Sequence, residues 1–238
     1  MYVFTRVPQT ASGETTTVPL LIAVGEQFVL TISREKLDLL EKFFSGKFDI
    51  YTTQKTKLLL QILFELTHVY QTSLTAINRR VRSTSVNLDR VSNDDVRQFV
   101  AFEITTNDFL DALVPTEVLL RNIVTGKFFR LFEDDRELMD DLVLGTRQGI
   151  ELGRASLKTI TNIRGAYSTI MTNNLNRVIK LLTALTIVFT IPTMIASLYG
   201  MNVPLPFSGS AAAFWVILLL TALVSAAVLG LFARNRWL

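Results

Sequence analysis

Residues 177–202 read RVIKLLTALTIVFTIPTMIASLYGMN, and this stretch decides the fold of the chain. Two cations, Arg177 and Lys180, precede a run over 181–197 that contains no charged side chain. About twenty such residues in an α-helix are enough to cross the hydrocarbon layer of a bilayer. The stretch therefore predicts a first membrane-spanning helix over 181–199.

Polar side chains recur along one face of this predicted helix. Their spacing alternates between three and four residues, which places them on one side of a helix; the hydroxyl side chains are Thr183, Thr186, Thr190, Thr193 and Ser197. The same face passes back through Ile179 and Asn176 and ends at Asn202. Hydroxyls in membrane helices often only donate to the carbonyl four residues earlier. Five aligned hydroxyls that end in Gly-Met-Asn instead favour a polar helix–helix contact or the wall of a water-filled pore.

A second apolar block completes a two-helix membrane region. No Asp, Glu, Lys or Arg occurs from Leu181 to Ala233. We divide the rest of this block into an outer loop over 200–210 and a second membrane helix over 211–233, followed by a basic tail over 234–238. Cations flank the block on both sides, namely Arg177, Lys180, Arg234 and Arg236. By the positive-inside rule both termini lie in the cytoplasm, and the protein is a multi-pass protein of the cell membrane.

The residues before this block predict a small cytosolic α/β part over 1–53 and a cytosolic helical region over 54–133. In the first, Val18–Val24 and Gln27–Ile32 are β-rich runs that predict a hairpin. In the second, Pro115 is expected to kink or interrupt a helix, because proline lacks an N–H and clashes with the preceding turn.

A very long stalk helix is predicted over 134–180, running into the first membrane helix. The helical pattern from Asp134 to Ser197 contains one potential break, Pro192. This gives about sixty-five residues, or nearly 100 Å at about 1.5 Å per residue. Gly145, Gly149 and Gly153 share one face, where they predict the close approach of another helix. The fold class is thus an α+β membrane protein with a long stalk.

Composition narrows the function by exclusion. The 238 residues include no Cys and one His, and the net charge is +3. Without Cys there is no disulfide framework and no thiolate metal site. We find no basic, aromatic-interleaved patch, which argues against a nucleic-acid partner. No nucleophile–base pair or phosphate loop is present, so the chain is not expected to be an enzyme.

The end of the first membrane helix resembles a known family. Tyr199-Gly200-Met201-Asn202, the approach sequence over 173–183 and the final Arg-Asn-Arg-Trp-Leu are similar to the CorA-type magnesium channels. The resemblance is specific from roughly Phe99 to Leu238 and looser before that. The α/β part is shorter than usual for that family, so its first strands could be missing.

The resemblance implies a homopentameric channel for Mg²⁺, and for Co²⁺ as a second ion, in the lipid membrane. Gly200, Met201 and Asn202 would form the outer selectivity filter, with Asn202 holding the cation. The pore would be lined by Asn176, Ile179, Leu182, Thr183, Thr186, Thr190, Thr193 and Ser197. Ile179 and Leu182 would form a hydrophobic constriction. Thr190 departs from the family, whose members often carry a bulky apolar residue there.

Asp141 is the candidate for regulation. It lies in an acidic cluster at the start of the stalk, where only the first carboxylates are explained by the helix dipole. When the chain is aligned with the CorA-type family at Gly-Met-Asn, Asp141 falls where the family has a carboxylate between subunits. The resemblance implies that this carboxylate senses cytosolic Mg²⁺. No other cofactor is expected. The alternatives are a zinc transporter of the same superfamily and a non-conducting, membrane-anchored stalk.

Overall fold

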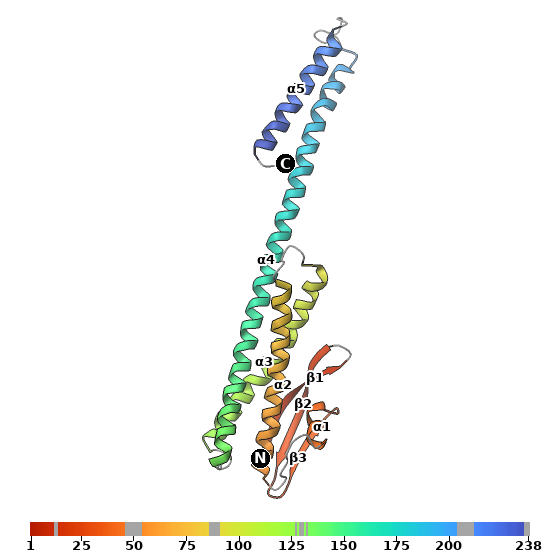
Figure 1. The fold of residues 1–238 in the computed structure, drawn as a ribbon. Coiled ribbons are helices and arrows are strands. Elements are labelled where there is room, and N and C mark those ends of the chain that lie inside the picture. Colours follow the sequence, from red (N-terminus) through yellow and green to blue (C-terminus); the bar gives the residue numbers. More distant parts are fainter. Residues whose placement is uncertain are drawn as a thin grey trace. The chain divides into compact units, whose positions relative to one another are not determined.

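The computed structural model describes residues 1–11, 14–45, 54–85, 91–126, 128, 131, 133–203 and 212–235. Along the chain the elements are β1 (Tyr2–Ala11), β2 (Glu14–Val24), β3 (Val29–Ser33), α1 (Asp38–Phe44), α2 (Lys55–Ser85), α3 (Asn93–Val124), α4 (Glu133–Tyr199) and α5 (Ala213–Arg234) (Figure 1). The chain divides into two compact units, Met1–Tyr167 and Ser168–Leu238, and α4 contributes to both.

The first unit contains a three-stranded antiparallel sheet in the order β1-β2-β3. The predicted hairpin is confirmed: β2 pairs with β3 across a turn in which the Gly25 N–H donates to the Phe28 carbonyl at 2.9 Å. On β1, Val3, Thr5 and Val7 are buried and the residues between them are exposed. This alternation is typical of a strand with one face packed on helices.

Tyr70 of α2 joins the helices to the sheet. Its hydroxyl donates to the Arg6 carbonyl of β1 at 2.9 Å. Its ring meets Phe109 of α3 edge to face, with ring centroids 5.0 Å apart. Burial raises the pKa of Tyr70 well above its ordinary value, so the hydroxyl stays protonated and remains a donor.

Helix α3 is continuous from Asn93 to Val124, so of the two predicted effects of Pro115, a kink or an interruption, the interruption does not occur. Proline removes the N–H that would bond the carbonyl of Asp111, four residues earlier. Both Pro115 and Asp111 are exposed, so water can satisfy that carbonyl. The helix begins with a capping box in which Ser92 and Asp95 bond each other's backbone N–H.

Gly145, Gly149 and Gly153, which share one face of α4, confirm the predicted close approach of neighbouring helices. A Cβ added at Gly149 would lie 3.5 Å from Leu113 of α3, and one at Gly153 would lie 3.0 Å from Leu110 of α3. At Gly145 the neighbour is Gln71 of α2, whose amide donates to the Gly145 carbonyl at 2.8 Å. In Figure 1, α2, α3 and the first part of α4 accordingly run side by side within this unit.

The second unit is a helical hairpin made from the end of α4 and α5 (Figure 1). Helix α4 runs through Pro192 to Tyr199, as the sequence predicts. The side chains of α4 that are least exposed in this unit are Ala184, Val188, Ile191, Pro192 and Ile195, with Ile170 nearer its start. On α5 the matching set is Ile217, Thr221, Ser225, Val228 and Phe232. The predicted fold class is confirmed: a small sheet, a helical region and one long helix that continues into the apolar pair.

Candidate functional site

The predicted polar seam lies on one exposed face of α4 in the second unit. All of its members are exposed in the chain by itself: Asn176, Ile179, Leu182, Thr183, Thr186, Thr190, Thr193 and Ser197. The apolar members are as accessible as the polar ones, with Ile179 51% and Leu182 64% exposed. Ala184 and Val188, which face α5, lie on the opposite side of the helix. One chain therefore offers one wall, and the seam faces away from its own second helix.

The threonine hydroxyls have a defined hydrogen-bond direction. Each donates to the carbonyl four residues earlier: Thr183 to Ile179 and Thr186 to Leu182, both at 2.8 Å, Thr190 to Thr186 at 2.7 Å, and Thr193 to Phe189 at 2.9 Å. This is the local bond expected of hydroxyls in membrane helices. It uses the hydroxyl proton and leaves the oxygen lone pairs free to accept a hydrogen bond. The seam therefore presents hydrogen-bond acceptors.

The Gly-Met-Asn turn ends α4 directly. The Gly200 N–H donates to the carbonyls of Ala196 and Ser197, at 3.0 and 3.2 Å, and the Met201 N–H donates to the Leu198 carbonyl. Asn202 is exposed beyond these bonds. The predicted outer loop beyond Val203 lies outside the described residues, as do Arg236 and the rest of the predicted tail after Asn235.

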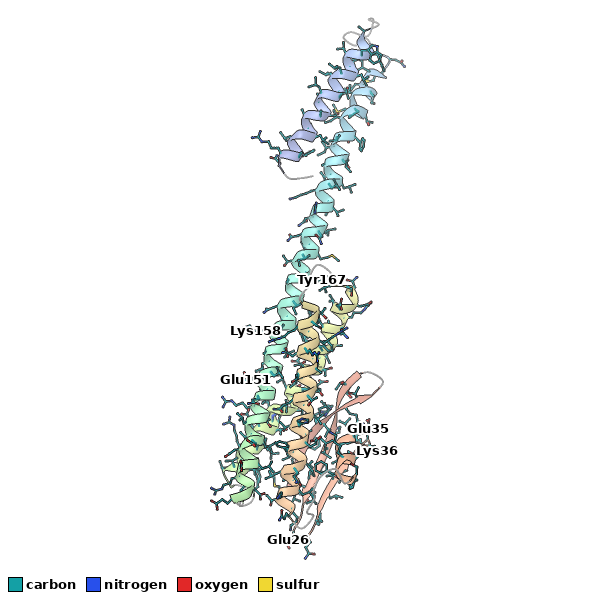
Figure 2. The ribbon with its side chains drawn as sticks, viewed as in Figure 1. Glu26, Glu35, Lys36, Glu151, Lys158 and Tyr167 are labelled. Carbon is teal, nitrogen blue, oxygen red and sulfur yellow. The ribbon has the colours of Figure 1, made fainter. Side chains whose placement is uncertain are left out.

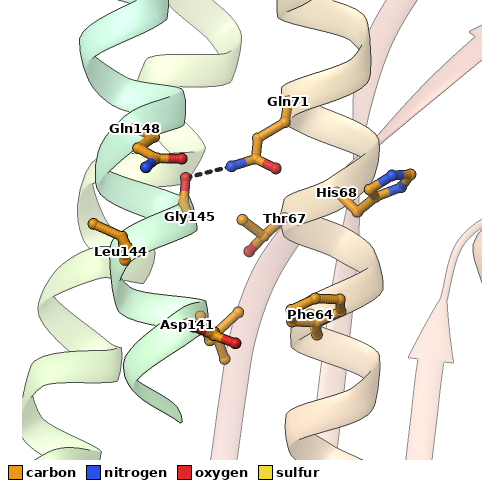
Figure 3. Close-up of a pocket in the computed structure, with 9 residues that line it drawn as sticks. Phe64, Thr67, His68, Gln71, Asp141, Leu144, Gly145 and Gln148 are labelled. Atoms are coloured by element: carbon orange, nitrogen blue, oxygen red, sulfur yellow. Dashed lines mark hydrogen bonds between the residues drawn. The ribbon is translucent and has the colours of Figure 1, made fainter. Parts of the chain in front are cut away.

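Asp141 lies in the first unit, in a groove between α2 and α4 (Figure 3). The groove has a volume of about 250 Å³ and is lined by Phe64, Thr67, His68, Gln71, Asp141, Leu142, Leu144, Gly145 and Gln148. Asp141 itself is exposed. Among the described residues, no group of three or more acidic or histidine side chains could hold a metal ion. Asp141 is therefore not part of a cluster of acidic or histidine ligands among these residues.

The sequence did not identify the α2 side of this groove. Phe64, His68 and Gln71 follow the spacing of one helix face, as do Asp141, Leu144 and Gln148 on α4. That spacing shows that each set is a face, but the pairing of the two faces depends on tertiary contacts. His68 is not paired with Glu65, which forms a salt bridge with Lys42 of α1.

Within the described ranges, two helices are long and apolar enough to cross a membrane. Their most apolar windows reach mean hydropathies of 2.0 in α4 and 2.7 in α5. Only 6% of each window is buried inside the structure. This exposure is unlike the core helix of a soluble protein, and it fits surfaces that lipid or other protein chains cover.

Comparisons with known proteins agree with this geometry. Residues 1–234 match the family model described as CorA-like Mg²⁺ transporter protein. A curated relative, the cobalt/magnesium transport protein CorA of Methanocaldococcus jannaschii, is 27% identical over 107 residues. That alignment covers 44% of this chain and 34% of the relative, so it spans about a third of the relative's length.

Three solved structures share the fold. The complete CorA magnesium transporter of Methanocaldococcus jannaschii has a TM-score of 0.84 at 22% identity, over 100% of this chain and 77% of that chain. The full-length CmaX protein has a TM-score of 0.78 at 22% identity, over 99% of this chain and 74% of that chain. The ZntB cytoplasmic domain from Vibrio parahaemolyticus is less similar, with a TM-score of 0.57 at 11% identity. This match covers 72% of this chain and 69% of that chain. Because the family model matches nearly the whole sequence, the chain belongs to the CorA-like Mg²⁺ transporter family.

Proposed function

We propose that several copies of this chain form a ring whose pore conducts hydrated Mg²⁺, with Co²⁺ as a second ion. The observation that carries the proposal is the exposed seam of α4, in which four threonine hydroxyls donate to carbonyls of their own helix and keep lone pairs free to accept. Two comparisons support the choice of ions. The chain belongs to a family described as Mg²⁺ transporters, and one relative is named a cobalt/magnesium transport protein.

The chemistry of the seam suits a cation that keeps its water shell. Mg²⁺ gives up its waters reluctantly, and the hydrogens of those waters point away from the ion. A wall of acceptors can receive these hydrogens, and the amide oxygen of Asn202 can do the same at the outer end. The membrane block from Leu181 to Ala233 contains no ionisable Asp, Glu, Lys or Arg that could relay protons, which argues against proton-coupled exchange.

A ring is required because one chain supplies only one wall. A closed ring of identical chains places the same seam around a common axis, and the family resemblance makes five copies the expected number. Ile179 and Leu182 would then form a hydrophobic constriction that gates by excluding water. The membrane potential can drive the ion into the cytoplasm, where both termini are proposed to lie. At 100 mV, inside negative, entry of a divalent cation is favourable by roughly 4–5 kcal/mol.

Regulation by cytosolic Mg²⁺ is proposed to act through Asp141. The carboxylate is exposed in the α2–α4 groove, so it is available to a ligand or subunit outside the chain. Mg²⁺ bridging Asp141 to a neighbouring copy would stabilise one state of the ring. Such a ligand shifts the equilibrium only by its difference in affinity for the two states.

The first experiment tests the filter by measuring Mg²⁺ uptake into liposomes that contain Asn202→Ala. Uptake should be lost while the oligomer keeps its mass, because Asn202 lies in an exposed turn. Asn162→Ala, an exposed asparagine of α4 in the first unit, is the matched control and should transport normally. Parallel assays with Zn²⁺ separate a zinc transporter from a magnesium channel. Normal Mg²⁺ uptake by Asn202→Ala would show that the filter is elsewhere.

The second experiment tests regulation by comparing Asp141→Asn with Asp140→Asn in inside-out patches. Both carboxylates are exposed, but only Asp141 lines the α2–α4 groove. Inhibition by internal Mg²⁺ should weaken in Asp141→Asn and remain unchanged in Asp140→Asn. Inhibition curves that superimpose for all three proteins would rule out a sensor at Asp141.

A further inference from the structure

The second unit carries cations without any acidic residue. Glu151, labelled in Figure 2, is the last Asp or Glu of the sequence. Three exposed cations follow in the described part of the hairpin: Arg177 and Lys180 on α4, and Arg234 on α5. The ion pairs found within the described ranges all lie between residues of the first unit. Among the described residues of the second unit, these three side chains, which we name the basic collar, therefore have no carboxylate partner.

The three cations share one level of the hairpin. Ala213 begins α5 and Arg234 ends it, while α4 ends at Tyr199. Both helices rise by about 1.5 Å per residue. A segment of α4 that ends at Tyr199 and is as long as α5 therefore begins at Val178, between Arg177 and Lys180. Figure 1 shows α5 running back along the last part of α4. The distance from this level to the turn, about 30 Å, matches the hydrocarbon thickness of a bilayer.

The collar on α4 faces away from the polar seam. At about 100° per residue, Arg177 lies roughly 160° and Lys180 roughly 100° around the helix from Ile179. Ala184 and Val188, which mark the side towards α5, lie at roughly 140° and 180°. The collar is therefore on the outer side of the proposed pore wall, where lipid is available.

Two simpler explanations do not account for the whole collar. The dipole of α5 favours a cation in its last turn, which explains Arg234. It does not explain Arg177 and Lys180, because α4 continues through them. The positive-inside rule explains their side of the membrane but does not supply counter-charges. A divalent cation that passes Asn176 and Ile179 would meet a repulsive ring at this same level unless anions neutralise it.

We propose that the basic collar is a binding site for the phosphate groups of anionic phospholipids, which neutralise it beside the ion path. This inference rests on the proposed function for its membrane setting. Clusters of Lys and Arg at the cytoplasmic membrane surface attract anionic lipids. Arginine can hold a phosphate through two parallel N–H donors, and lysine adds a point charge. A free phosphate offers the same chemistry, but the location of the collar at headgroup depth selects the lipid.

The test measures lipid retention by native mass spectrometry on the full-length, delipidated oligomer. Phosphatidylglycerol and phosphatidylcholine are added separately to wild type and to the triple variant Arg177→Gln/Lys180→Gln/Arg234→Gln. Each neutralised cation should weaken phosphatidylglycerol binding about fivefold, and the triple variant roughly 100-fold, from the usual strength of one cation at an anionic surface. The matched control is Arg79→Gln/Arg147→Gln/Lys158→Gln, which removes three exposed cations of the first unit and should bind as wild type does.

Two further arms keep the result interpretable. The charge-conserving variant Arg177→Lys/Lys180→Arg should retain the lipid, and the single variant Lys180→Gln provides a fivefold step if the triple variant does not assemble. Equal retention of the two lipids by wild type, or unchanged retention in Lys180→Gln and the triple variant, would overturn the proposal. Displacement of phosphatidylglycerol by inorganic phosphate at equal concentration would also overturn it, by showing a soluble-phosphate site. Lipid binding is measured without ion flux, so a failed uptake assay with intact lipid selectivity would refute only the proposed function.

Discussion

Gly153→Ala is expected to destabilise the first unit, whereas Gly165→Ala is expected to stabilise it. Both glycines lie inside α4, where alanine is favoured over glycine by about 1 kcal/mol. A Cβ at Gly165 meets no atom within 4 Å, so this gain is kept. A Cβ at Gly153 would lie 3.0 Å from Leu110 Cδ2 and 3.3 Å from its Cγ. An extra methyl group in such a packed site costs about 1–3 kcal/mol, which leaves a net loss of roughly 0–2 kcal/mol.

The assay is amide hydrogen exchange of the α3 and α4 peptides in the detergent-solubilised full chain. Exchange reports local stability and does not require the two compact units to unfold together. Protection in α4 should rise about fivefold in Gly165→Ala, since about 1 kcal/mol corresponds to that factor. It should fall in Gly153→Ala. Gly149→Ala is an internal check: its Cβ would make an ordinary 3.5 Å contact with Leu113, so protection should rise. Equal changes at Gly153 and Gly165 would refute the packing argument.

Three further predictions follow from individual contacts. Tyr70→Phe should lower the stability of the first unit by about 1–3 kcal/mol, because it leaves the Arg6 carbonyl without its donor; unchanged exchange in β1 would contradict this. Bonds from the Ser92 backbone N–H and hydroxyl lower the pKa of the Asp95 carboxyl, so its stabilising effect is present above the ordinary pKa and is lost as the pH falls through the lower folded value. Exchange in the first turn of α3 should therefore differ between wild type and Asp95→Asn at pH 7 and converge in strong acid, and a difference that grows on acidification would be inconsistent with the cap. Thr190→Val should reduce Mg²⁺ uptake without changing assembly. The control, Thr221→Val, removes a similarly bonded hydroxyl from the α4-facing side of α5 and should have little effect. Equal uptake by both variants would count against an acceptor wall.

Several features of the fold could be read from the sequence because they depend on neighbours along the chain. The uncharged run after Lys180 predicted the end of α4, since crossing a bilayer requires a fixed length of apolar helix. The spacing of the threonines placed their side chains on one face, which the structure shows as exposed. The β2–β3 hairpin followed from two β-rich runs and a short turn.

Other features could not be predicted because local rules have exceptions set by exposure. Pro115 was expected to kink or interrupt α3, but it does not interrupt the helix, because the carbonyl it frees belongs to the exposed Asp111. Strand β1 was not singled out within the α/β part, and its identity depends on pairing with β2 along its whole length. The sequence left open whether the hydroxyls only bond back to their own helix, and the structure shows this bond for Thr183, Thr186, Thr190 and Thr193.

The sequence by itself determined the membrane pair, the polar seam and the family resemblance at Gly200-Met201-Asn202, because lipid imposes a length and polarity requirement that each helix satisfies locally. The tertiary structure decided which helices approach Gly145 and Gly153, and it placed Asp141 in a groove whose other wall is α2. The antiparallel pairing of α4 and α5, together with their lengths, also indicates that Arg177 and Arg234 lie near one level of the hairpin. These features join residues far apart in the chain, so they exist only once the helices have packed in a particular register, and helical periodicity defines faces without pairing them.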